Sequence, residues 1–204
     1  MVRHGTTPTT GKVLPGRARG LSLADAGRQE AERVAEHFRS LEIDAVYSSP
    51  LERARETAAP IAAALGQQVV TERGLLECDF GDWTGAELSA LRKLPGWKTV
   101  QRFPSGFRFP SGESFVELQA RVQQAVLSLC ERHPGKAIVA VSHADCIKAV
   151  VALALGVPLD LFQRIVIGPC SSTVVAYGAE GPVVLAVNSY GPPAGIRPRR
   201  GSRT

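Results

Sequence analysis

The sequence of 204 residues is poor in several features that define large classes of proteins. It contains no apolar run close to the ~18 residues that a membrane span requires. It does not open with a basic segment followed by an apolar one, as a secretion signal does. Its cysteines lie far apart without a CxxC pair: Cys78, Cys130, Cys146 and Cys170. These absences predict a cytoplasmic protein with reduced thiols, and they disfavour a disulfide framework or a zinc knuckle.

The positive charge of the chain has a local source. The formal net charge is +5, but residues 191–204 contain four arginines and no acid, and +5 less 4 leaves +1 for the rest. A nearly neutral remainder argues against binding to nucleic acid or to a membrane surface. We therefore predict one domain over residues 1–190, followed by a disordered basic tail over residues 191–204 that is rich in proline, glycine and arginine.

Strand and helix patterns alternate along the chain, and 44% of its residues are hydrophobic, which suffices for a core. Helical spacing of apolar residues marks four segments: 24–41, 51–66, 113–132 and 144–156. Short apolar runs mark strands at 44–50, 67–72, 136–143, 172–177 and 182–189, with the last two placed to form a hairpin. The alternation predicts an α/β fold, a three-layer α/β/α sandwich with a mostly parallel central sheet.

Residues 94–112 break this pattern. The segment is rich in proline and glycine and interleaves aromatic with basic residues: Trp97, Lys98, Arg102, Phe103, Phe107, Arg108 and Phe109. We predict a long loop without regular structure here. Such a loop in a compact domain is either a functional lid or a floppy surface excursion.

Two of the four histidines lie where predicted strands end. His4 follows a possible short first strand, and His143 follows the apolar strand that precedes a helix. Because the carboxyl ends of parallel strands meet at one edge of a sheet, we expect both histidines at the same crevice. His37 and His133 lie on helices, where a solvated or structural role is the ordinary interpretation.

Charged residues accompany these histidines. Arg53 and Arg55 follow another predicted strand and lie in the first turn of a helix, where a cation is unfavourable unless an anion binds. We expect Arg55 to face solvent. Glu77 lies in a glycine-containing loop and is either a general acid or a counter-ion of the arginines. A metal site made of His4, His143, Glu77 and Asp145 is an alternative, although no ligand-spacing signature supports it.

Five segments follow one another in a characteristic order: MVRHGTT at 1–7, SSPLERARET at 48–57, LLECDFGDWTG at 75–85, PSGES at 110–114 and VSH at 141–143. Together they resemble the histidine phosphatase superfamily, the phosphoglycerate mutase-like proteins, over residues 1–190. The resemblance implies roles for six residues: His4 as the phosphate-accepting nucleophile, Arg3, Arg53 and Thr7 as substrate-binding residues, His143 as the second histidine of the pocket, and Glu77 as the acid.

The resemblance implies a phosphoglycerate mutase-like fold and a metal-independent, histidine acid phosphatase-type enzyme without a cofactor. It would cleave a small phosphorylated metabolite through a phosphohistidine on His4, with Glu77 as proton donor. The predicted partners include no nucleic acid and no membrane, and the choice between monomer and homodimer stays open. A phosphoglycerate mutase-type phosphotransferase and a catalytically silent phosphate-binding module are the alternatives.

This sequence departs from the family pattern in a few places. Only two residues precede Arg3, where the family has a full strand, so we expect a truncated or misassigned start or a very short first strand. Thr10 replaces an asparagine, Ala144 and Asp145 follow the second histidine, and Lys148 replaces an arginine. Phe80 replaces the tyrosine of the mutases and favours a phosphatase, because it has no donor for a substrate carboxylate.

Overall fold

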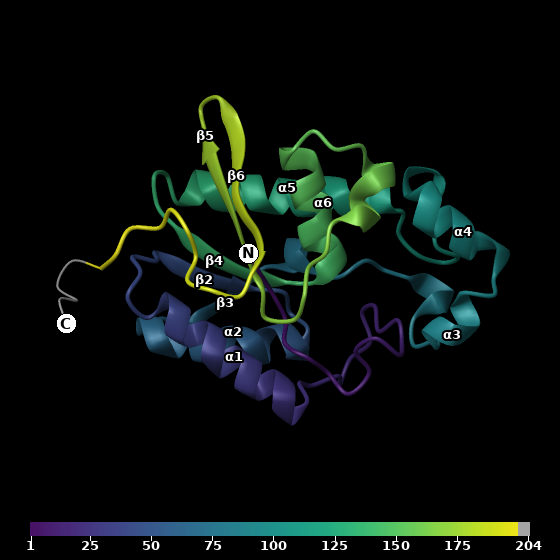
Figure 1. The fold of residues 1–204 in the computed structure, drawn as a ribbon, viewed down its shortest axis with the longest axis horizontal. Helices are drawn as coiled ribbons and strands as arrows, with labels where there is room; N and C mark the ends of the chain where they lie inside the picture. Colours follow the sequence, from purple (N-terminus) through teal and green to yellow (C-terminus); the bar gives the residue numbers. More distant parts are fainter. Residues whose placement is uncertain (200–204) are drawn as a thin grey trace.

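The computed structural model describes residues 1–199 and contains one six-stranded sheet in the order β3-β2-β4-β1-β5-β6 (Figure 1). The strands are β1 (Val2–Arg3), β2 (Ala45–Ser48), β3 (Val69–Thr71), β4 (Ile138–Ser142), β5 (Ser172–Gly178) and β6 (Gly181–Ser189). β1 to β4 pair in parallel, and the β5–β6 hairpin joins β1 in antiparallel orientation. The predicted mostly parallel sheet and the predicted hairpin are therefore confirmed.

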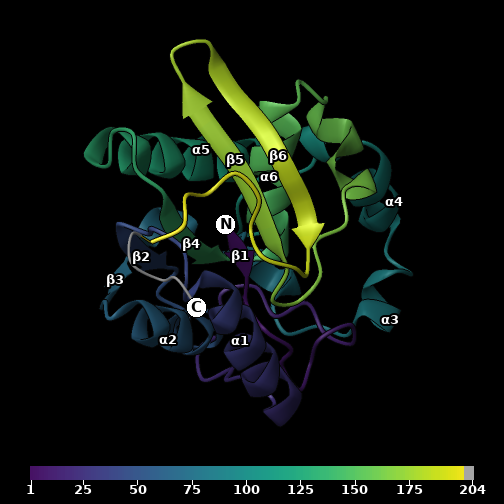
Figure 2. The ribbon, with the colours of Figure 1, turned by 60° about the vertical axis from the view of Figure 1, so that its left-hand side comes forward.

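Helices cover both faces of this sheet. One face carries α1 (Asp25–Phe38) and α2 (Glu52–Leu65), and the other carries α5 (Phe115–Arg132) and α6 (Ala144–Ala154) (Figure 2). Successive strand residues point to opposite faces, so Val46 and Val139 join the α1–α2 core, whereas Tyr47 and Ala140 join the α5–α6 core. This double burial explains why the predicted strand over 136–143 is a nearly continuous apolar run.

Local signals in the sequence set the ends of two of these helices. α2 stops at Gly66, which adopts the left-handed conformation (φ 66°) that glycine tolerates best. α5 starts with a capping box in which Ser114 accepts a hydrogen bond from the Glu117 backbone and the Glu117 side chain binds the Ser114 backbone. The prediction of both helices is confirmed to within a few residues.

Residues 94–112 differ from the prediction of a loop without regular structure. They contain α4 (Pro95–Arg102), which follows the short helix α3 (Leu88–Leu91). Pro95 occupies the first turn, where its missing N–H is not needed, and Trp97 stacks on Trp83 with ring centroids 6.4 Å apart. Phe107 contacts the same indole at 5.4 Å. An aromatic cluster therefore organises the segment, which contradicts the alternative of a floppy excursion.

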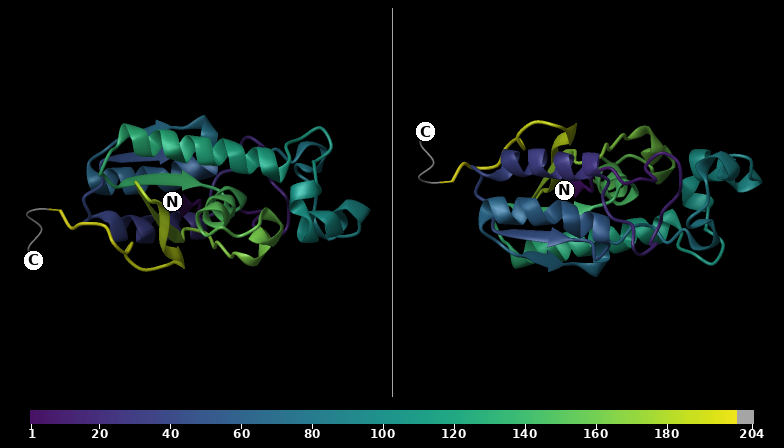
Figure 3. Two further views of the ribbon diagram at one scale, coloured as in Figure 1. Left: turned by 90° about the horizontal axis from the view of Figure 1, so that it is seen from above. Right: turned by 90° about the horizontal axis from the view of Figure 1, so that it is seen from below.

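Both α3 and α4 lie at the end of the molecule towards which β4 points (Figure 3). Four short 3₁₀ helices complete the described structure: Arg73–Leu75, Gly81–Trp83, Pro104–Gly106 and Leu159–Arg164. None of the helices within residues 1–199 is long and apolar enough to cross a membrane.

The predicted disordered tail is partly wrong. Residues 191–199 lie against the connection between α1 and β2, where the Glu42 N–H donates to the Arg197 carbonyl at 2.8 Å. The Arg199 N–H donates to the Ser40 carbonyl at 2.8 Å, and Leu41 forms an isolated β-bridge with Pro198. Backbone hydrogen bonds, which composition does not reveal, hold this segment in place. Residues 200–204 of the predicted tail lie outside the described residues.

Candidate functional site

The short strand β1 delivers Arg3 and His4 to the carboxyl edge of the sheet. The His4 N–H donates to the Ser142 carbonyl of β4 at 2.9 Å, and Gly5 follows directly. A β-carbon on Gly5 would lie 2.6 Å from the Gly27 carbonyl oxygen of α1, so only glycine allows this close approach. The glycine of the RHG motif therefore lets the chain after His4 pass close to the backbone of α1.

The hydrogen bonds of His4 determine which ring nitrogen carries the proton. Nδ1 lies 2.8 Å from the Gly5 carbonyl oxygen, which only accepts, so Nδ1 bears the hydrogen. Nε2 then presents a lone pair, and it accepts from Nε of Arg53 at 3.3 Å. Burial, followed by the charges of Arg53 and Arg3, lowers the pKa of His4 to about 3. The imidazole is therefore neutral, and its Nε2 is nucleophilic at physiological pH.

Arg53 is fully buried in the first turn of α2, whereas Arg55 is exposed, as predicted. Nη2 of Arg53 donates to the Gly16 carbonyl at 2.7 Å, and this bond fixes the Arg53 guanidinium beside His4. Thr57 supports this arrangement because its hydroxyl donates to the Arg53 carbonyl at 2.7 Å and accepts from the Gly5 N–H at 3.0 Å. The helix and the loop after β1 are thus joined at the site.

His143 follows β4 directly, and its ring centroid lies 5.2 Å from that of His4. The ring is fully buried, and its Nε2 lies 2.8 Å from the Ser49 hydroxyl. Burial, followed by the charge of Arg53, lowers the pKa of His143 well below its usual value. When the Ser49 hydroxyl donates to Nε2, Nδ1 of the neutral ring is left as a donor. Ser49 lies in the SSPLER segment, but the sequence analysis did not predict its contact with His143.

Four buried side-chain nitrogen atoms have no hydrogen-bond partner among residues 1–199, and three of them belong to the residues of this cluster. These three are Nε of Arg3, Nη1 of Arg53 and Nδ1 of His143; the fourth is Nδ1 of His37 in α1. Arg3 is otherwise held by the Ile167 carbonyl, to which its Nη1 donates at 2.7 Å. Buried donors without acceptors cost free energy, and native proteins rarely keep them without a purpose. A tetrahedral oxyanion would supply the acceptors that these three groups lack.

Glu77 is the acidic member of this cluster. Its carboxylate accepts from the Cys78 N–H at 2.9 Å and is almost fully buried. Burial, followed by the negative charge of Asp145, raises the pKa of Glu77 to about 7, although Arg53 and Arg3 oppose the shift. The carboxyl group therefore keeps a proton close to neutral pH, as a general acid requires.

Two further arginines hold the backbone around Glu77, and the sequence analysis missed both. Arg17 donates through Nε to the Glu77 carbonyl at 2.8 Å, and Arg121 of α5 donates through Nη1 to the Leu76 carbonyl at 2.9 Å. Both also bind the half-buried carboxylate of Glu113. No local signal identifies these contacts, because each arginine binds a loop that is distant in the sequence.

Thr7 is buried, and its side-chain hydrogen bonds are to residues nearby in the sequence. Its hydroxyl lies 3.0 Å from that of Thr10 and 3.3 Å from that of Thr9. Within residues 1–199, no group of three or more histidine, cysteine, aspartate or glutamate side chains is arranged to hold a metal ion. The alternative metal site that combined both histidines with Glu77 and Asp145 therefore gains no support from the geometry.

The family model of the histidine phosphatase superfamily (branch 1) matches residues 1–190. Phosphoserine phosphatase 1 of Hydrogenobacter thermophilus is 30% identical over 178 residues, which cover 85% of this chain and 84% of the relative. A probable phosphoglycerate mutase of Salmonella arizonae is 34% identical over 183 residues, 87% of this chain and 83% of the relative. Among solved structures, a mycobacterial glucosyl-3-phosphoglycerate phosphatase superposes with a TM-score of 0.83 and 26% identity, covering 93% of this chain and 97% of that one.

Proposed function

From the premise that this chain belongs to the histidine phosphatase superfamily, whose matched relatives are phosphatases or mutases, we propose that it is a metal-independent phosphohydrolase. It cleaves a small phosphomonoester through a phosphohistidine on His4. One observation carries the proposal: the neutral His4 presents the lone pair of Nε2 beside Arg53, among three buried nitrogen donors without partners. A nucleophile and a set of anion donors thus occupy the same place.

In the first step, the Nε2 lone pair of His4 forms a bond to phosphorus while the ester P–O bond breaks. The leaving alkoxide takes its proton from the Glu77 carboxyl, whose raised pKa of about 7 keeps it protonated. The proton on Nδ1 stays on the ring and is donated to the Gly5 carbonyl oxygen, which stabilises the positive charge that develops on the imidazole. The products of this step are the free alcohol and the phosphoenzyme.

In the second step, water replaces the alcohol. Glu77, now ionised, accepts a proton from the water as the water oxygen attacks phosphorus, and the N–P bond breaks with its electron pair returning to Nε2. Phosphate leaves, and both His4 and Glu77 regain their starting protonation states. A single carboxyl group thus serves as acid and then as base.

Charge stabilisation in both steps falls to Arg3, Arg53 and His143. Arginine side chains fork onto the equatorial oxygens of a transferring phosphoryl group, where negative charge accumulates. Burial lowers the pKa of both guanidinium groups, but the pKa of arginine lies so far above neutral pH that both groups stay charged. Fixed cations of this kind do the work that a divalent metal does elsewhere. The proposed enzyme therefore needs no metal or other cofactor.

A phosphoglycerate mutase-type reaction is the second candidate, because a relative carries that name. Phe80 supports the phosphatase: it takes the place of the mutase tyrosine and packs on Phe109 with ring centroids 4.8 Å apart. A buried phenyl ring cannot donate a hydrogen bond to a substrate carboxylate. Among the basic residues of 94–112, Arg108 pairs with Glu117 on the surface, and Lys98 and Arg102 are exposed.

The test combines a nucleophile variant with a substrate panel. The panel contains p-nitrophenyl phosphate, phosphoserine and 3-phosphoglycerate, and both phosphate release and 3- to 2-phosphoglycerate conversion are followed. We expect phosphate release that survives EDTA, an acid-labile phosphoprotein in the wild type, and neither in His4→Ala. His37→Ala is the matched control with unchanged rates. Full turnover in His4→Ala contradicts the mechanism, and interconversion faster than phosphate release assigns a mutase.

A further inference from the structure

One peptide group next to the proposed active site is hydrogen-bonded to a side chain on each of its two sides. This group joins Ile167 to Gly168. Its carbonyl accepts from Nη1 of Arg3 at 2.7 Å, and its N–H donates to Oδ1 of Asn188 at 2.7 Å. The peptide is trans, so its C=O and N–H point in opposite directions. Asn188 and Arg3 are therefore the two ends of one chain of hydrogen bonds that runs through this peptide group.

The guanidinium of Arg3 depends on this one carbonyl for its position. Within residues 1–199 the Arg3 side chain donates a single hydrogen bond, the one to the Ile167 carbonyl, and its Nε has no partner. Arg53, by contrast, is held from two sides, by His4 and by the Gly16 carbonyl. A group that orients the Ile167 carbonyl therefore also orients the Arg3 guanidinium.

The backbone that follows this peptide is held by other contacts. The Arg3 N–H donates to the Ser171 carbonyl at 3.2 Å, and the Cys170 N–H donates to the Arg3 carbonyl at 3.1 Å. The Ser171 hydroxyl donates to the Gly168 carbonyl at 2.8 Å. None of these bonds involves the N–H of Gly168, and glycine restricts the rotation of its peptide plane less than other residues do. The side chain of Asn188 is therefore the contact that sets the orientation of this plane.

The backbone of Asn188 is itself unusual. Its φ is 54°, in the left-handed region that residues other than glycine rarely adopt, although asparagine tolerates it better than most. Residues 172–174 of β5 lie opposite residues 186–189 of β6, so β6 has one extra residue here and forms a β-bulge. The Asn188 N–H donates to the Thr173 hydroxyl at 3.3 Å. Bulges and strained residues gather near active sites, where they redirect a side chain, and this bulge directs Asn188 to Gly168.

We propose that Asn188 is a positioning residue of the phosphatase reaction: it orients the peptide between Ile167 and Gly168, and this peptide holds the Arg3 guanidinium in place for the phosphoryl group. The inference rests on the function proposed above for Arg3. Donation of the peptide N–H to Asn188 also polarises the carbonyl and makes it a stronger acceptor for Arg3. β6 lies two strands from β1 in the sheet (Figure 2), so an edge strand without any of the site motifs acts on the site.

The experiment starts from two substitutions that keep the backbone of residue 188. Asn188→Gly removes the acceptor and adopts the left-handed conformation without strain, whereas Asn188→Asp keeps an acceptor and tolerates that conformation. With p-nitrophenyl phosphate as substrate, we expect kcat/KM to fall by about 10- to 30-fold in the glycine variant and to stay within about threefold of the wild type in the aspartate variant. Ser189→Ala is the matched control with wild-type rates, because the Ser189 hydroxyl binds the Gly191 N–H instead of the peptide beside Arg3.

A double-mutant cycle with Arg3 separates positioning from a general loss of stability. If Asn188 acts through Arg3, Asn188→Gly costs at most about twofold more in kcat/KM once Arg3 is alanine. The dissociation constant of inorganic phosphate should follow the same pattern, and this measurement does not require turnover. Arg3→Met, which keeps the length of the side chain, is the second background in case the alanine variant does not fold.

The outcomes distinguish this inference from the proposed function. Equal losses from Asn188→Gly with and without Arg3 overturn the inference. So do wild-type kcat/KM and phosphate affinity in Asn188→Gly when Arg3→Ala or Arg3→Met is impaired. Wild-type rates and phosphate affinity in the Arg3 variants themselves contradict the proposed role of Arg3, and this inference fails with it.

Discussion

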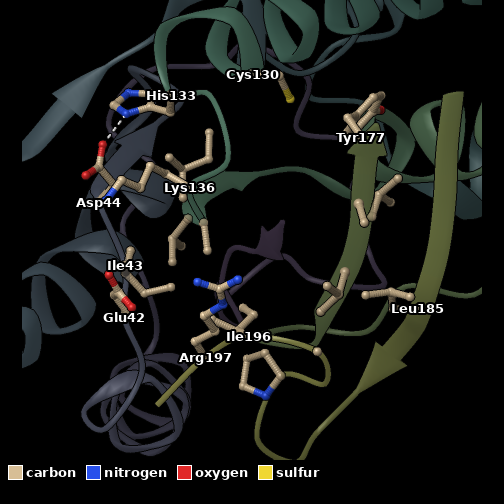
Figure 4. Close-up of a pocket in the computed structure, with 18 of the residues that line it drawn as sticks. Glu42, Ile43, Asp44, Cys130, His133, Lys136, Tyr177, Leu185, Ile196 and Arg197 are labelled. Carbon is tan, nitrogen blue, oxygen red and sulfur yellow. Dashed lines mark hydrogen bonds and ion pairs between the residues drawn. The ribbon is translucent and has the colours of Figure 1, made fainter. Parts of the chain in front are cut away.

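The two ends of the central sheet differ in how their interiors are filled. At the carboxyl end, Arg53, His143 and Glu77 are buried among backbone carbonyls and N–H groups, and His4 completes the cluster. At the amino end, a cavity of about 1070 Å³ separates β4 from β5 beside Met1. Buried charge is concentrated where the chain is tightly packed, whereas the cavity is lined by apolar residues together with charged ones such as Asp44, Lys136 and Arg197 (Figure 4).

This difference explains why the proposed reaction takes place at the carboxyl end of the sheet. Buried charges require fixed partners, and the carboxyl end has them in the loops after β1, β2 and β4. The same burial lowers the pKa of His4 and raises that of Glu77, which suits the proposed roles of nucleophile and acid. Changes at the carboxyl end should therefore alter rate, whereas changes at the amino end should alter stability.

The largest expected effect comes from Arg53. Arg53→Ala should lower kcat/KM by about 10³-fold, because it removes the buried cation beside His4 that we propose binds the phosphoryl group. Arg53→Lys should recover only part of this loss, since lysine cannot donate two parallel hydrogen bonds to a phosphoryl group. Arg55→Ala, at an exposed position of the same helical turn, is the control and should keep wild-type rates. Equal losses in the two alanine variants would contradict the assigned difference between the arginines.

Next in size is the effect of removing the acid. Glu77→Gln should slow hydrolysis of alkyl phosphates by about 10²- to 10³-fold. The loss should be much smaller for p-nitrophenyl phosphate, because nitrophenolate leaves without a proton. Parallel measurements of kcat/KM on phosphoserine and on the nitrophenyl ester check this. A loss of the same size on both substrates would assign Glu77 to binding rather than to proton donation.

Deleting residues 191–204 tests the amino end. The Glu42–Arg197 and Ser40–Arg199 backbone bonds are lost, so the unfolding midpoint should fall by roughly 2–6 °C. The kcat/KM of the folded protein should stay within about twofold of the wild type, because Arg197 and Arg199 bind the backbone of residues 42 and 40 rather than the cluster around His4. Thermal unfolding and initial rates at a low temperature separate the two effects. A large fall in kcat/KM without a fall in the unfolding midpoint would contradict the expectation that changes at the amino end alter stability rather than rate.

The smallest expected effect is a shift in pH dependence. The raised pKa of Glu77, about 7, means that the acid form is present below pH 7 and lost above it, so kcat/KM should fall on the alkaline side. Asp145→Asn removes a negative charge that raises this pKa, and the alkaline limb should move to lower pH by several tenths of a unit. The pH profile of kcat/KM on phosphoserine measures the shift. A limb that stays in place would show that Asp145 does not act on Glu77.

Much of the site could be predicted because its residues sit beside strong local signals. His4, Arg53 and His143 each follow a strand, and the end of a parallel strand is a definite place in the fold. Arg17 and Arg121 could not be found in this way, because their partners are carbonyls of residues 76 and 77, far away in sequence. Helix α4 was missed because the prolines and glycines of its segment favoured a loop, whereas its packing depends on the contact of Trp97 with Trp83.

The sequence by itself determined the layered α/β architecture, the ends of α2 and α5, and the order of the site motifs, because apolar periodicity, capping residues and glycines act locally. Only the tertiary structure decided that Arg197 and Arg199 bind the backbone of residues 42 and 40, that burial raises the pKa of Glu77, and that a cavity opens between β4 and β5. Each of these depends on burial between segments that are distant along the chain. Burial changes the cost of charge and of unpaired backbone, and no local pattern records it.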